Sequence, residues 1–395
     1  MDIIDVGEKE KEKELPEKII EDQEELDNLS LSGDSGTLGG ERVYPMTNIQ
    51  VERGFYTVFE LKRKYDKTDR QIILDADFQR DDVWKIKQKC ELVESVLMGL
   101  PLPIFYFNQN KKGKLIVVDG RQRLTALFEY MNDKFALKGL SILGELNKKK
   151  FKDLTPIQQS MIEDYQIQAH VILPPTPERI KFDIFDRVNR AGTQLNKQEI
   201  RNALYQGKAT DLLRNLSESE EFFMATGGAF KNEKRMKDKY LIIRFLSFYL
   251  FLKHSIKDEK GELFEYRNDI DELLAKTMEM LNDWEKEDIE KIEMLVKKAL
   301  GKSYFYLGKD AFRLLKEDGK KSAINMNLFE TILYIMLYLP EKDETIVREV
   351  EHKVSCLLKN EKFLDAIGNH RDNINKVRIR FNMAGAIGKE FSHDS

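Results

Sequence analysis

The stretch LIVVDGRQRLTALF, residues 115–128, contains two different hydrophobic periods. Leu115–Val118 is a short apolar run rich in β-branched residues, which predicts a buried strand. From Leu124 onward the apolar residues recur at helical spacing and would cover one face of a helix. Asp119–Gly120 lies between the two patterns and is a turn signal. The stretch therefore predicts a strand, a tight turn and a helix whose first turn holds residues 121–123.

The two arginines of this predicted first turn are unusual for their position. A helix N-terminus carries N–H groups without helical partners and a partial positive charge, so acidic residues are favoured there. Arg121 and Arg123 work against that dipole unless an anion binds at the helix start. A phosphate group suits the N–H groups, the dipole and the guanidinium forks together. The alternative is that Asp119 is only a helix cap and that the arginines lie on a solvated face.

Composition limits the kinds of function that the chain can have. The 395 residues have a net charge of -4, so there is no global basic surface and any contact with nucleic acid must come from local patches. The two cysteines, Cys90 and Cys356, lie far apart and the five histidines are isolated, which argues against a structural zinc site. The acidic N-terminus lacks the apolar segment of a signal peptide, and we therefore expect a cytoplasmic protein.

The two longest apolar runs are predicted to be core helices. They span Leu241–Leu252, which contains Arg244, and Leu328–Leu339, which contains Glu330. Both fall short of the roughly 20 residues that a membrane-spanning helix needs. We therefore expect no contact with a membrane.

Periodicity and breaker residues predict an α+β chain, with a small mixed α/β domain followed by a larger all-helical domain. The predicted divisions are a charged, disordered arm at 1–43, the α/β domain at 44–195 and the helical domain at 196–395. Asn196 and Glu199 resemble a capping box that starts the first helix of the helical domain. Strands are expected at 72–74, 103–107, 115–118 and 166–173. Helices are expected at 57–65, from 83, from 155, from 177, at 209–223, 235–253, 268–284, 287–300, 325–338 and 345–357, and after Asn373.

Three further groups of polar residues are candidates for a site. Phe78-Gln79-Arg80 follows a predicted strand and precedes a helix, as the central motif does, although a surface ion pair of Arg80 is the simpler interpretation. Arg187 and Asn189 lie near a helix end, where cations are favoured by the dipole alone. A basic cluster is the best candidate in the helical half for contacts with a DNA backbone, although such clusters are more often solvated faces. Its residues are Lys231, Lys234, Arg235 and Lys237.

Taken together, these motifs resemble one protein family, the N-terminal domain of GmrSD-type restriction endonucleases, also catalogued as domain of unknown function 262. The resemblance covers roughly residue 50 to the C-terminus. It implies a sheet similar to the ParB/sulfiredoxin nucleotide-binding fold, followed by a helical domain, in a bacterial protein that acts against modified or foreign DNA. The motifs that carry the resemblance are Phe78-Gln79-Arg80 with Trp84, Asp119-Gly120-x-Gln122-Arg123-Leu124-Thr125, and Arg187-x-Asn189-x-x-Gly192-Thr193-x-Leu195.

The resemblance also implies residue roles in binding and hydrolysing a nucleoside triphosphate. Asp119, Gln122 and Arg123 inherit the catalytic role, with Asp119 holding Mg²⁺ or orienting the attacking water. Arg121 stands where the commonest family motif has Gln. Residues expected to contact the nucleotide are Phe78, Gln79, Arg80, Gly120, Arg121, Arg187 and Asn189.

Two other functions stay open. Family members that cut DNA often carry a separate HNH nuclease domain, and the sequence shows no such arrangement of histidines. The chain could therefore be a non-enzymatic module that binds DNA or recruits a nuclease or another defence protein as partner. Alternatively, the ParB-like domain could itself be a DNase with clustered metal-binding carboxylates. These would be Asp75, Asp77, Asp81, Asp82 and Asp119.

The composition of the N-terminal arm generates a first testable prediction. Deleting residues 1–40 should leave the melting temperature of the remaining chain unchanged, because the arm has too few apolar residues to join a core. Differential scanning fluorimetry of the full and shortened chains measures this directly. A large drop in melting temperature after the deletion would contradict the prediction.

Overall fold

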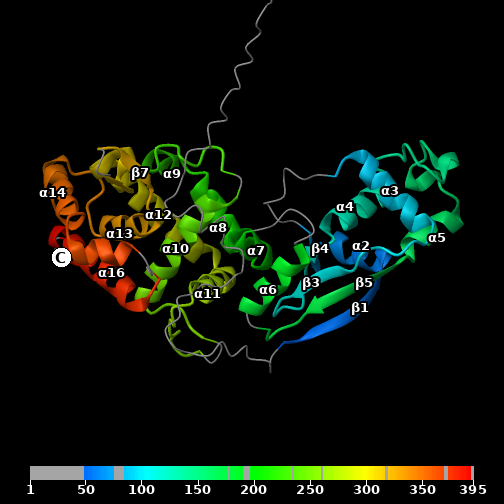
Figure 1. The fold of residues 1–395 in the computed structure, drawn as a ribbon, viewed down its shortest axis with the longest axis horizontal. Coiled ribbons are helices and arrows are strands. Elements are labelled where there is room, and N and C mark those ends of the chain that lie inside the picture. Colours follow the sequence, from blue (N-terminus) through cyan, green and yellow to red (C-terminus); the bar gives the residue numbers. More distant parts are fainter. Residues whose placement is uncertain are drawn as a thin grey trace, which may run out of the picture.

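A computed structural model describes residues 49–74, 84–176, 178–189, 196–233, 235–258, 261–315, 319–368 and 372–392. Figure 1 shows an α/β part on the right and a helical part on the left, with the C-terminus at the far helical end. This arrangement confirms the predicted order of a mixed α/β region followed by a helical region. The ParB-like identity of the sheet and the division at 195/196 stay predictions.

The α/β part is built on a five-stranded mixed sheet with the strand order β1-β5-β3-β4-β2. β4 pairs with β2 in parallel and with β3 in antiparallel orientation, while β5 is parallel to β3 and antiparallel to β1. The strands are β1 (Val51–Thr57), β2 (Ile72–Ile73), β3 (Phe105–Gln109), β4 (Leu115–Asp119) and β5 (Gln166–Ile172). Its helices are α2 (Val58–Asp66), α3 (Ile86–Leu97), α4 (Arg121–Met131) and α5 (Pro156–Glu163).

Both faces of the central sheet are covered, because side chains alternate between them along each strand. Leu115 and Val117 of β4 belong to the core that the sheet shares with α3 and α4. Val118 instead belongs to the core of the helical part, as does Ile172 of β5. Helices α6 and α7 both contact β4 and so connect the two parts of the molecule.

The helical part contains the remaining helices and one small β-hairpin. The predicted helix over 209–223 was wrong as one element, because Ser219 caps a new helix by accepting a hydrogen bond from the backbone N–H of Phe222 at 3.2 Å. The helices are α6 (Glu178–Asn189), α7 (Lys197–Leu204), α8 (Lys208–Ser217), α9 (Glu220–Ala225), α10 (Lys237–Leu252), α11 (Ile270–Asp283), α12 (Lys286–Leu307), α13 (Met326–Met336), α14 (Val347–Leu357), α15 (Glu361–Ile367) and α16 (Ile374–Phe391). The hairpin consists of β6 (Arg313–Leu315) and β7 (Lys321–Ile324).

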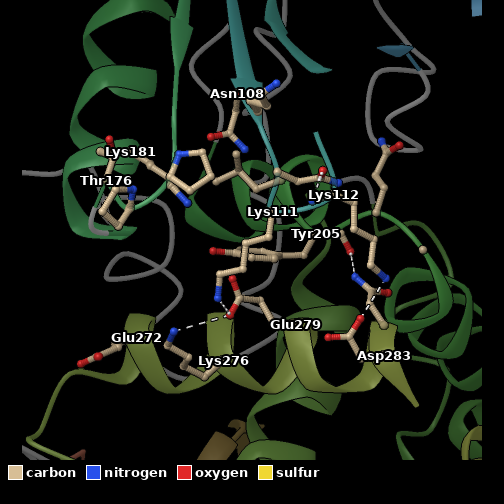
Figure 2. A pocket seen from close by; sticks show the side chains of 18 of the residues that line it. Asn108, Lys111, Lys112, Thr176, Lys181, Tyr205, Glu272, Lys276, Glu279 and Asp283 are labelled. Atoms are coloured by element: carbon tan, nitrogen blue, oxygen red, sulfur yellow. Dashed lines mark hydrogen bonds and ion pairs between the residues drawn. The ribbon is translucent and has the colours of Figure 1, made fainter. Parts of the chain in front are cut away.

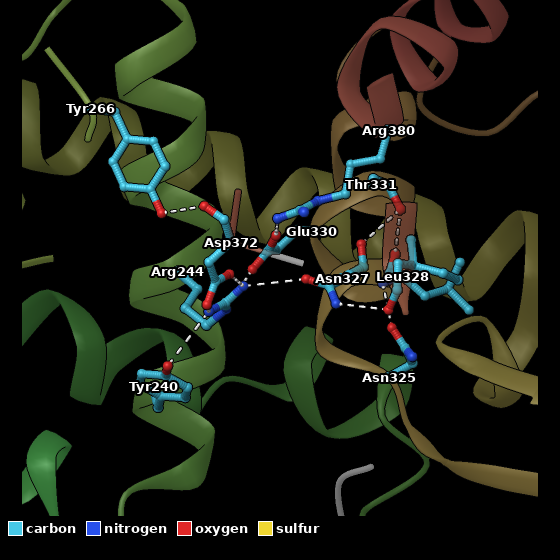
Figure 3. A network of polar contacts seen from close by, with 11 residues as sticks. Tyr240, Arg244, Tyr266, Asn325, Asn327, Leu328, Glu330, Thr331, Asp372 and Arg380 are labelled. Carbon is cyan, nitrogen blue, oxygen red and sulfur yellow. Dashed lines mark hydrogen bonds and ion pairs between the residues drawn. The ribbon is translucent and has the colours of Figure 1, made fainter. Parts of the chain in front are cut away.

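A buried network of charges links α10, α13 and α16 (Figure 3). Glu330 is fully buried and receives hydrogen bonds from Arg244 Nε at 2.6 Å and from Arg380 Nη2 at 2.8 Å. Arg244 also donates to Asp372 at 2.8 Å, and Tyr266 donates to the carbonyl oxygen of the same residue at 2.7 Å. Two cations and two carboxylates therefore balance one another inside the helical core.

This network generates a prediction about stability. Glu330→Gln should lower the free energy of unfolding by about 3–5 kcal/mol, because it removes the carboxylate between two buried guanidinium groups. The matched control is Glu390→Gln, which breaks an exposed pair with Lys353 and should cost no more than about 1 kcal/mol. Urea denaturation of both variants gives the two values. Equal costs would show that the buried network contributes no special stability.

Candidate functional site

β2 runs parallel to β4, and its two residues, Ile72 and Ile73, pair with Leu115 and Ile116 at the start of that strand. The candidate site lies at the other end of β4, its carboxyl end. Asp119 ends β4 there, and the backbone N–H of Trp84 lies 3.5 Å from Oε1 of Gln122 in the helix that follows. We call this end of the sheet, formed by Trp84 and residues 119–123, the Asp119 edge.

The turn at this edge requires glycine. Gly120 has a φ of 97°, in the left-handed region, and a Cβ atom at this position would lie 2.1 Å from Cδ1 of Phe105. The residue is also the N-cap of α4, and no side chain in the described part of the chain caps this helix start. The interpretation of Asp119 as merely a helix cap is therefore wrong, because Asp119 is the last residue of the strand.

Asp119 is held in place by Arg123 instead. Nη2 of Arg123 donates to Oδ2 of Asp119 at 2.8 Å, and the guanidinium group also donates to the carbonyl oxygens of Pro103 and Ile104. Its central carbon lies 4.0 Å from the centre of the Phe105 ring, a cation–π contact. Burial lowers the pKa of Arg123, and the charge of Asp119 opposes that shift.

The exposure of this pair suggests different tasks for its two members. The side chain of Arg123 is 10% exposed, whereas that of Asp119 is 40% exposed. Arg123 therefore fixes the turn from inside, and Asp119 presents a partly solvated carboxylate at the edge of the sheet. The catalytic role of Arg123 stays a prediction, and its contacts favour positioning of Asp119 over direct contact with a substrate.

The other residues predicted for the site are only partly covered by the structure. Arg121 and Gln122 occupy the first turn of α4, as the sequence predicted, and both are half-buried. Arg187 is exposed on α6, a helix that contacts β4, and Asn189 is the last residue of that helix. The predicted residues outside the described part of the chain are Phe78, Gln79 and Arg80, together with Asp75, Asp77, Asp81 and Asp82 and with Gly192, Thr193 and Leu195.

The basic cluster predicted for DNA contacts does not form one exposed patch. Lys237 is buried, Lys231 is exposed, and Lys234 lies outside the described residues. Nη2 of Arg235 donates to Oε2 of Glu199 at 3.1 Å, so this arginine joins the start of α10 to α7. Contact of this cluster with DNA stays a prediction.

Sequence reasoning missed a second role for one carboxylate near this cluster. Glu199 completes the predicted capping box with Asn196, whose backbone N–H donates to Oε2 at 2.6 Å. Glu199 also pairs with Arg235. The contacts with Asn196 and Arg235 lower the pKa of Glu199, but its burial has the larger effect and raises the pKa above the ordinary value. The burial of Glu233 likewise raises its pKa. The only sequence signal for this arrangement was the capping pattern.

The described residues offer limited means of binding a metal ion. They contain no group of three or more His, Cys, Asp or Glu side chains placed to hold one. Among the described residues that form the Asp119 edge, Asp119 supplies a carboxylate. This fits the way proteins bind Mg²⁺ together with a nucleotide, through one or two carboxylates plus phosphate oxygens.

The fold and the edge geometry define a mixed α/β domain with an Asp-Gly turn at the start of a helix, joined to a helical region. Residues 60–206 match the model of the GmrSD restriction endonuclease, N-terminal domain. The match confirms the family that the motifs suggested. A search of curated proteins and a search of solved structures found no match.

Within the described residues, no helix combines the length and the apolar character that crossing a membrane requires. The apolar runs of α10 and α13 are instead buried in the helical core, as predicted.

The turn geometry generates a prediction about Gly120. Gly120→Ala should destabilise the chain by more than the roughly 1–2 kcal/mol of left-handed strain, because its methyl group would also clash with Phe105. Gly139→Ala is the control, since Gly139 has a φ of 69° and its new methyl group would meet no described atom within 4 Å. Thermal unfolding of both variants separates strain from clash. A Gly120→Ala cost equal to that of Gly139→Ala would contradict the proposed contact.

Proposed function

We propose that this chain is a restriction-type defence protein whose Asp119 edge binds and hydrolyses a nucleoside triphosphate. The observation that carries the proposal is the start of α4 directly after Asp119, at the carboxyl end of β4, where the N-cap residue is a glycine and brings no side chain of its own to the helix start. A helix N-terminus favours phosphate because its first N–H groups and its dipole both attract anions. The family match to a restriction endonuclease domain supports the role in defence.

The contacts suggest a division of roles within the motif. Asp119 would hold Mg²⁺ or orient the attacking water, Arg121 contacts a phosphate, and Arg123 positions Asp119 from the interior. In the reaction, the water oxygen attacks the terminal phosphorus while the bond from that phosphorus to its bridging oxygen breaks. The products are a nucleoside diphosphate and phosphate, and the proton lost by the water passes to solvent. Mg²⁺, when bound, would neutralise charge on the phosphates.

A test of this function uses the full chain with Mg²⁺ and each of the four nucleoside triphosphates, with and without DNA. Asp119→Asn should retain nucleotide binding but lose at least tenfold in phosphate release, because the charge that acts on metal or water is gone. Arg121→Gln should weaken binding by roughly 10- to 100-fold, the scale of one hydrogen bond to a charged group. Arg63→Gln, at an exposed position on α2, is the matched control.

Two results would overturn parts of this proposal. Unchanged turnover in a folded Asp119→Asn variant would remove the catalytic role of that carboxylate. Binding of nucleotide or DNA by the wild-type chain without any turnover would instead favour the non-enzymatic binding module. Melting temperatures of all variants show whether each change acts on the site or on the fold.

A further inference from the structure

A second candidate site lies at the opposite edge of the same sheet. β3 and β5 are parallel neighbours, paired from Phe105↔Ala169 to Asn108↔Ile172, and β3 is antiparallel to β4. Their carboxyl ends therefore point away from the Asp119 edge. A cleft of about 930 Å³ opens there between the sheet and α11 (Figure 2). This volume falls in the range of pockets that hold small ligands, and such pockets favour the carboxyl ends of strands.

The most informative residue in this cleft is Asn108 of β3. Its side chain is 3% exposed and lines the cleft, and among the described residues its Oδ1 atom has no hydrogen-bond partner. A buried acceptor without a donor is costly, so this atom calls for a donor from a water molecule or a ligand. The neighbouring Phe105 and Phe107 belong to the core with α3 and α4, so alternation places Asn108 on the face toward the helical part.

Apolar groups surround the amide and charged groups close the mouth of the cleft. Pro174, Leu204 and Phe264 are among the lining residues. At the mouth, Lys111 and Lys112 of the β3–β4 turn form ion pairs with α11. They reach Glu279 at 3.3 Å and Asp283 at 2.9 Å, respectively (Figure 2).

The ion pair of Lys112 can exchange its partner at little cost. Lys112 and Asp283 are 66% and 69% exposed, and exposed pairs of this kind contribute little to stability. A phosphate group could therefore replace Asp283 as the partner of Lys112, and Lys111 of the same turn would add a second positive charge beside it. The cleft thus combines a buried amide, apolar walls and two lysines at its mouth.

We propose that this cleft binds an adenine nucleotide, with the base on Asn108 and the phosphate on Lys111 and Lys112. A side-chain amide offers an acceptor beside a donor, and adenine offers the matching donor and acceptor at N6 and N7. The base satisfies the Oδ1 atom that the protein leaves without a donor. The site is separate from the Asp119 edge and does not depend on hydrolysis there.

Isothermal titration of the full chain with adenosine 5′-monophosphate tests the proposal. Asn108→Leu should reduce the affinity at least tenfold without lowering the melting temperature, because it removes an amide whose acceptor has no donor among the described residues. Lys111→Gln combined with Lys112→Gln should also reduce it at least tenfold. Asp119→Asn and Lys298→Gln, an exposed lysine paired with Glu341 on the helical part, should leave the affinity unchanged.

The comparison of variants distinguishes this site from the proposed hydrolytic one. Failure of the wild-type chain to bind the monophosphate at millimolar concentration would overturn the inference while leaving triphosphate turnover untouched. Equal affinity in Asn108→Leu, or a loss of affinity confined to Asp119→Asn, would overturn it as well. A single-stranded oligo(dA) added in competition tests whether the nucleotide can be part of a DNA strand. If it can, the oligonucleotide should displace the monophosphate, and the binding of the oligonucleotide should itself weaken in Asn108→Leu.

Discussion

The structure depends on the requirement that β4 be covered on both faces. Its apolar side chains point alternately into two different cores, one shared with α3 and α4 and one belonging to the helical part. A sheet with both faces apolar cannot remain stable with one face in water, because the exposed face would lose its hydrophobic stabilisation. The helices α6 and α7, which contact β4, therefore complete the α/β part. The family match, which ends at residue 206, includes both helices.

In the charged network of the helical part, the buried residues of opposite charge also depend on one another. Arg244 and Glu330 each interrupt an apolar run that is otherwise suited to a core, and each would be costly there alone. The fold brings them together at 2.6 Å, so each residue makes the burial of the other tolerable. This pairing fixes the relative placement of α10 and α13, because a shift of either helix would leave a charge without its partner.

Sequence reasoning predicted the parts of the fold that have strong local signals. The strand, turn and helix around Asp119 begin and end nearly where the hydrophobic periods change, and Thr155-Pro156 starts α5 as expected. The edge strand β1 was missed because its side chains are mostly exposed and show no apolar alternation. The hairpin of β6 and β7 and the short helix α15 were missed for another reason, because elements of three to seven residues carry little periodicity.

The candidate site could be predicted only in part, because residue type does not reveal which side chain faces inward. Arg121 and Arg123 looked equivalent as phosphate contacts, yet Arg123 lies against the Phe105 ring and binds backbone oxygens. Likewise nothing in the sequence marks Asn108. This residue stands out only in the structure, where the described residues supply no hydrogen-bond donor to its buried Oδ1 atom.

The sheet topology offers a physical link between the two edges. β3 and β4 are antiparallel neighbours joined by a short turn, so Asn108 and Asp119 lie near opposite ends of one paired unit. Phe105, at the start of β3, contacts both Gly120 and Arg123, while Lys111 and Lys112 follow the end of the same strand. The residues of the two sites are thus held by the same pair of strands, β3 and β4, at its two ends.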